Sequence, residues 1–106
     1  MTDSEGNRPP ADDDIVQHLA AWANDILALS MAHARLREDQ ASRAAAHGNW
    51  KYDFPATGII IAKHNNAKAQ VDRAAWSLVT AYLQRGQLNA AVEVRALADN
   101  ILRCFT

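Results

Sequence analysis

Apolar residues recur at alternating intervals of four and three positions through the first half of the chain. Side chains at this spacing fall on one face of an α-helix, so the pattern predicts a long helix from about Asp13 to about His47. Val16, Ala23 and Leu27 widen its apolar face. We call the central stripe of this face the seam; its residues are Ile15, Leu19, Trp22, Ile26, Leu29, His33 and Leu36.

The second half of the chain carries the same spacing from about Thr57 to about Arg85. Three consecutive isoleucines at positions 59–61 are β-branched, which leaves an extended conformation of residues 58–62 as an alternative. We favour a second helix because the helical spacing continues unbroken through them. Its stripe consists of Ile60, His64, Ala67, Val71, Ala74, Leu78 and Tyr82.

Gly86 is expected to end the second helix, and a third, shorter helix is expected to begin near Leu88 or Asn89. The residues around this turn resemble the inter-helix turn of one tetratricopeptide-repeat unit; they are Ala81, Tyr82, Gly86, Ala91, Val92 and Ala98. The closing proline of that repeat is missing, and the sequence contains no second copy. The resemblance therefore implies a tight helical hairpin, and it does not imply a repeat groove that binds peptides.

The composition favours an all-α fold. Alanine, the strongest helix former, occupies 22 positions, whereas the four glycines and three prolines lie near the edges of the predicted helices. We predict a small antiparallel bundle of three main helices: a long first helix, an aromatic loop, a long second helix and a shorter third helix. Residues 12–106 are expected to form this single helical domain, and the polar, acidic residues 1–11 a disordered tail.

Aromatic and polar residues alternate between the first two predicted helices, at Trp50, Lys51, Tyr52 and Phe54. In an extended loop the three rings would lie on one side. Either they close the open end of the bundle, or at least one of them anchors a partner, because Trp and Tyr dominate binding hot spots. We predict that these four residues bind a partner and that Trp50 is the exposed anchor.

The sequence shows no arrangement of residues typical of a catalytic site. It contains no nucleophile elbow, no phosphate-binding loop and no paired carboxylates, and Cys104 has no histidine near it in the sequence. No two histidines are spaced three or four positions apart, as a helical metal site would require. We therefore predict a protein that is not an enzyme and that has no metal site and no cofactor.

His33 and His64 lie on the apolar stripes of the two long helices. If these helices pair antiparallel about Tyr52, His33 faces the region of Val71, and His64 lies about 10 Å away along the helix axis. A metal ion shared by the two histidines is then not expected. Each histidine is expected to be hydrogen-bonded within the stripe and to set the register, with a pH-sensitive interface as the alternative.

Charge is distributed unevenly along the chain. The formal net charge is −1, but residues 1–14 carry −4 and the remainder carries +3. A mildly basic body leaves nucleic-acid binding as an alternative function. However, Lys63, Lys68 and Arg73 are five positions apart and rotate away from one another by about 140°. The pattern expected of a DNA-recognition helix is weak as well. The side chains that could read base edges are only Asn65, Asn66, Lys68 and Gln70.

These observations predict a non-enzymatic protein-interaction module, a small regulator, adaptor or inhibitor that binds a larger protein; a dimeric nucleic-acid-binding regulator is the alternative. The first helix would be about 50 Å long, which is more than one chain can cover, unless it breaks near residues 30–34 or leaves its C-terminal end exposed. We therefore expect a homodimer. The sequence has no membrane span or secretory signal, so a cytoplasmic location is expected. The residues expected in the dimer interface, or in the core beneath it, are Ile15, Leu19, Trp22, Ile26, Leu29 and His33.

Overall fold

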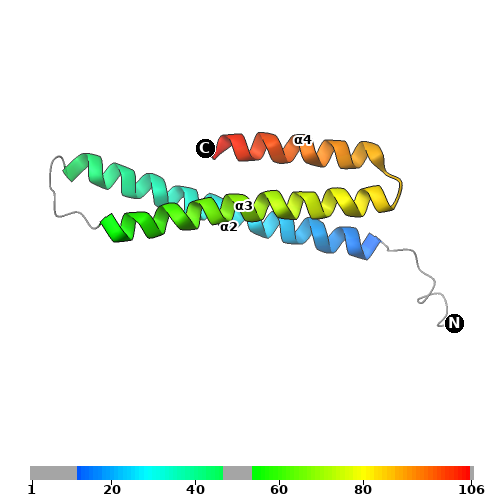
Figure 1. The fold of residues 1–106 in the computed structure, drawn as a ribbon, viewed down its shortest axis with the longest axis horizontal. Helices are drawn as coiled ribbons and strands as arrows, with labels where there is room; N and C mark the ends of the chain where they lie inside the picture. The colour runs from blue at the N-terminus through cyan, green and yellow to red at the C-terminus, as the bar shows by residue number, and fades with distance from the viewer. Residues whose placement is uncertain (1–11, 47–53, 106) are drawn as a thin grey trace.

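The computed structural model describes residues 12–46 and 54–105, and the side chains of residues 14–45 and 58–105. The described residues form three α-helices: α2 (Asp12–Ala46), α3 (Phe54–Gln84) and α4 (Leu88–Cys104). Helix α3 runs antiparallel to both α2 and α4 and contacts each of them (Figure 1). This arrangement confirms the predicted all-α antiparallel bundle with a long first helix, a long second helix and a shorter third helix.

The helix boundaries follow the sequence pattern except at the start of α3. This helix begins at Phe54, three residues before the predicted Thr57, and it includes residues 58–62. The extended alternative for residues 58–62 is therefore wrong. The assignment of Phe54 to an extended loop is also wrong, because its backbone is helical. Pro55 is compatible with this earlier start, because the first turn of a helix makes no use of the N–H that proline lacks.

A tight turn at Gly86 joins α3 to α4. Gly86 has a positive φ of 75°, a conformation that glycine adopts without the steric cost that a Cβ atom imposes. The N–H of Gly86 donates to the carbonyl of Leu83 at 3.0 Å, and the N–H of Gln87 donates to the carbonyl of Tyr82 at 2.9 Å. The tight helical hairpin implied by the sequence around this turn is confirmed.

The core is formed within one chain, between α3 and the two helices that contact it. Three seam residues spaced seven positions apart, Ile15, Trp22 and Leu29, are buried in it, whereas Leu19 is exposed and Ile26 is half-buried. The buried seam residues therefore pack inside the chain, and a second copy would have to use another face of α2. The buried apolar residues are Ile15, Trp22, Leu29, Val71, Ala75, Leu78, Val79, Ala81, Ala91, Val94 and Ala98.

The molecule is long and flat. Its extents are 69 × 28 × 14 Å, and the radius of gyration of its Cα atoms is 19.1 Å, compared with about 13 Å for a compact domain of this length. Helix α4 has 17 residues and α3 has 31, so α4 stops short of the first turns of α3 (Figure 1). At that end of the molecule, α2 and α3 pack only against each other among the described helices.

Candidate interaction site

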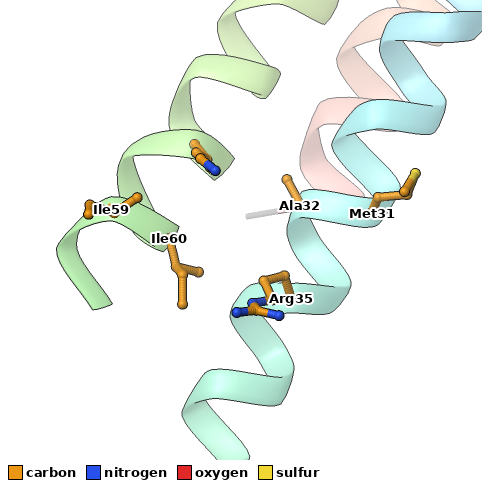
Figure 2. Close-up of a pocket in the computed structure, with 6 residues that line it drawn as sticks. Met31, Ala32, Arg35, Ile59 and Ile60 are labelled. Atoms are coloured by element: carbon orange, nitrogen blue, oxygen red, sulfur yellow. The ribbon is translucent and has the colours of Figure 1, made fainter. Parts of the chain in front are cut away.

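A groove lies between α2 and α3 at the end that α4 does not reach. It encloses a volume of about 550 Å³. In Figure 2, Ile60 of α3 and Arg35 of α2 extend toward each other across it. Three residues from each helix line the groove: Met31, Ala32 and Arg35 from α2, and Ile59, Ile60 and Lys63 from α3.

The walls of the groove carry large apolar side chains that the chain itself does not cover. Met31 is 66% exposed and Ile59 is 56% exposed, and Ile60 is half-buried between the helices. Complete burial of such a side chain contributes about 1.5–3 kcal/mol relative to exposure. A partner that covers Met31 and Ile59 would therefore gain a substantial part of its binding free energy from these two residues.

Two cations, Arg35 and Lys63, stand on opposite walls of the groove. The spacing of Arg35, Asp39 and Arg43 would allow two ion pairs along α2, but in the described structure Asp39 pairs only with Arg43, at 3.3 Å between Oδ2 and Nε. Neither Arg35 nor Lys63 has a carboxylate partner among the described residues. The groove thus combines an apolar floor with two positive charges available to a ligand.

His33 and His64 meet in the structure, contrary to the sequence-based prediction. His33 Nδ1 lies 3.1 Å from His64 Nε2, and the ring of Phe105 packs edge-on against His33 with centroids 5.1 Å apart. The predicted offset of about 10 Å is wrong because the helices pair about a point between positions 48 and 49 rather than about Tyr52. Each position by which this centre moves shifts the facing residue by two positions, about 3 Å.

The contact between the two rings depends on their protonation. One nitrogen must donate and the other must accept, so two fully protonated rings cannot keep the hydrogen bond. Burial lowers the pKa of His33, and the positive charges of His64 and Arg37 lower this pKa further. His64 itself is buried. The folded structure therefore favours the neutral form of His33.

We expect the free energy of unfolding to decrease as the pH falls from 7.5 to 5.5. The unfolded chain binds a proton at His33 near the ordinary pKa of about 6.5, whereas the folded chain binds it only at lower pH, so protons favour the unfolded state across this range. Urea denaturation at several pH values measures the decrease. Replacing His33 with Gln should flatten the pH dependence, and replacing His18, which lies outside the pair, should leave it unchanged. An unchanged pH dependence in the His33→Gln variant would contradict this assignment.

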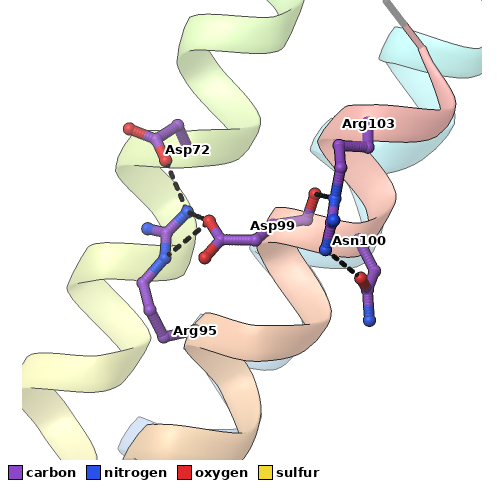
Figure 3. A network of polar contacts seen from close by, with 5 residues as sticks. All are labelled: Asp72, Arg95, Asp99, Asn100 and Arg103. Atoms are coloured by element: carbon purple, nitrogen blue, oxygen red, sulfur yellow. Dashed lines mark hydrogen bonds and ion pairs between the residues drawn. The ribbon is translucent and has the colours of Figure 1, made fainter.

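A second polar cluster ties α3 to α4. The guanidinium of Arg95 donates from Nη2 to Asp72 Oδ1 at 2.8 Å and to Asp99 Oδ1 at 2.6 Å, and it lies 4.5 Å from the ring centroid of Trp76 (Figure 3). Burial alone lowers the pKa of Arg95, but hydrogen bonds to Asp99 and Asp72 and their negative charges outweigh it and raise the pKa. Arg95 of α4 thus pairs with one carboxylate on α3 and one on its own helix, and the pair with Asp72 acts as a structural tie between the helices.

The residues predicted to bind a partner can be placed only in part. Trp50, Lys51 and Tyr52 lie outside the described residues, and of Phe54 only the helical backbone is described. Their proposed role stays a prediction. The sequence did not predict the groove, because of the isoleucines at positions 59–61 only Ile60 belongs to the predicted apolar stripe of the second helix. Three large apolar residues in a row on a helix cannot all face one core, and that signal could have indicated an uncovered surface.

Within residues 12–46 and 54–105, no group of three or more His, Cys, Asp or Glu side chains is placed to hold a metal ion. Cys104 is exposed. None of the described helices is both long enough and apolar enough to span a membrane. Comparison of the chain with protein-family models, with curated proteins and with solved structures finds no match.

Proposed function

We propose that this chain is a non-enzymatic protein-interaction module, a small regulator, adaptor or inhibitor that works as a homodimer and binds a larger protein. The observation that carries this proposal is the groove between α2 and α3, where exposed apolar side chains occur together with two cations that have no carboxylate partner among the described residues. Its volume of about 550 Å³ falls within the range of about 300–1,000 Å³ common to ligand sites.

The lining of the groove indicates the chemistry of the segment that it binds. An amphipathic helix presents apolar side chains three and four positions apart, which would contact the apolar lining of the groove. Lys63 on the α3 wall would attract a carboxylate beside that apolar stripe. The groove therefore fits a helical segment of another protein that has one apolar face and acidic residues at its margin.

Binding of designed peptides tests this proposal. The probes are two fluorescently labelled helical peptides that share one leucine stripe and differ only in whether glutamate or lysine flanks it. Fluorescence anisotropy should show binding of the acidic peptide to the native chain. Replacing Ile59 with Glu should weaken that binding at least tenfold, because a charge would replace an apolar side chain of the groove lining. The matched control is Leu97→Glu, an equally exposed position on α4, which should bind the peptide normally.

Four results would contradict the proposal. Binding of neither peptide would show that the groove does not accept a helix. Equal binding of the acidic and basic peptides, or equal binding by the Ile59→Glu variant, would show that these residues do not form the site. Tight binding of random duplex DNA with a steep dependence on salt concentration would favour the nucleic-acid function instead.

A further inference from the structure

The groove between α2 and α3 continues past Arg35 toward the C-terminal end of α2. A second hollow of about 160 Å³ opens there, and both Arg35 and Ile60 line it as well as the groove. Its other lining residues all belong to α2; they are Glu38, Asp39 and Ser42. The two hollows adjoin each other along Arg35 and Ile60, and we call the combined surface the extended groove.

The α2 wall of the extended groove contains a single row of side chains. Met31, Arg35, Glu38 and Ser42 are spaced four, three and four positions apart. At about 100° per residue they fall within about 60° of one another around the helix, and the row is about 16 Å long. Because a helix advances about 5.4 Å per turn, a helix lying along this row would meet its members one turn at a time.

The charge along this row changes sign within one turn. Arg35 is positive, as is Lys63 on the opposite wall, whereas Glu38 is negative, and all three side chains are exposed. The neighbouring Asp39 is already paired with Arg43. Glu38 forms no ion pair within the part of the chain that the structure describes. The extended groove therefore offers a ligand two cations and, one turn further along α2, one carboxylate.

We infer that Glu38 selects among partner helices by favouring one that carries a basic residue one turn from its acidic residue. The inference rests on the proposed function and makes its partner more specific. A carboxylate of the bound helix would pair with Arg35 and Lys63, and a Lys or Arg three or four positions away would pair with Glu38. A helix with an entirely acidic margin would instead place a carboxylate against Glu38, where like charges repel.

Glu38 is expected to affect selectivity more than total affinity. An exposed ion pair contributes little to binding, because water and salt screen it and two flexible side chains must be ordered. Two peptides that differ only in the sign of the charge opposite Glu38 differ both in the attraction gained and in the repulsion avoided. The apolar lining, which both peptides contact in the same way, supplies most of the affinity of each.

Fluorescence anisotropy with two labelled helical peptides tests the inference. Both peptides carry the same leucine stripe; one has glutamate at every flanking position, and the other has lysine at the flanking position one turn from a retained glutamate. The native chain should bind the mixed peptide about threefold more tightly than the acidic one in low salt. Glu38→Lys should reverse this preference, and 1 M NaCl should abolish it.

The matched control is Glu93→Lys on α4. Glu93 is exposed and lies outside the lining of the extended groove, and its replacement changes the net charge of the chain by the same amount. Substitutions at such exposed helix positions change stability little, so both variants should fold. Glu93→Lys should keep the preference of the native chain for the mixed peptide.

Equal binding of the two peptides by the native chain would overturn the inference, and so would an unchanged preference in Glu38→Lys. A reversal in Glu93→Lys as well would overturn it too, because net charge rather than the position of Glu38 would then set the preference. In each of these cases the proposed function stands, provided that the acidic peptide binds. Binding of neither peptide would reject the proposed function and the inference together.

Discussion

Truncation of Leu29 to alanine is expected to lower the free energy of unfolding by about 2–5 kcal/mol. Leu29 is 0% exposed and belongs to the same core cluster as Val71 and Leu78. Removing its isopropyl end leaves a cavity that two long, rigid helices can fill only in part. Urea denaturation followed by circular dichroism measures the loss, which is a large fraction of the stability of a domain of this size.

The matched control for this prediction is Leu97→Ala on α4. Leu97 has the same side chain in the middle of a helix but is 51% exposed. Its truncation should change the free energy of unfolding by no more than about 0.5 kcal/mol. Equal effects of the two substitutions would show that Leu29 is not part of the packed core.

The buried part of the first helix was predictable because burial on a helix follows a local period. Positions 15, 22 and 29 are spaced seven apart and are buried, and the apolar spacing places all three on the predicted stripe. Leu19 and Ile26 belong to the same stripe but lie on its flank, where they are partly exposed. The spacing could not show whether α3 or a helix of a second copy buries this stripe. A helix from either source would satisfy the same pattern.

The contact between His33 and His64 was not predictable from the same pattern. It depends on where α2 ends and α3 begins, and helix ends are the least certain part of a sequence-based prediction. The start of α3 at Phe54 moves the midpoint between the two helices from about position 52 to about position 50, which accounts for about one of the two turns by which the facing residues differ. A small error in the predicted boundary of a helix therefore changes which residues of α2 and α3 face each other along the whole pair.

The groove depends on the relative lengths of the helices. Leu27 and Leu29 are the same residue type two positions apart, yet one is 60% exposed and the other is fully buried. The groove exists because α4 is short and packs along α3 rather than along α2 (Figure 1). Sequence periodicity describes each helix separately, and it does not show which faces remain uncovered once the helices pack.

Replacing Arg95 with alanine is expected to lower the free energy of unfolding by about 1–2 kcal/mol. The substitution removes hydrogen bonds to Asp72 on α3 and to Asp99 on α4, and it uncovers the ring of Trp76. Because Asp72 and Asp99 are partly exposed, water offsets part of the lost ionic interaction. Urea denaturation of the purified variant measures the loss.

Two further substitutions identify which interaction of Arg95 matters. Arg95→Lys keeps the positive charge but cannot donate to both carboxylates through one planar group, so it should recover only part of the lost stability. A double-mutant cycle between Arg95→Ala and Asp72→Ala should give a coupling energy of about 0.5–1 kcal/mol that decreases in 1 M NaCl. Zero coupling would mean that the ion pair does not hold α4 against α3. Packing of the Arg95 side chain on Trp76 would then account for its contribution.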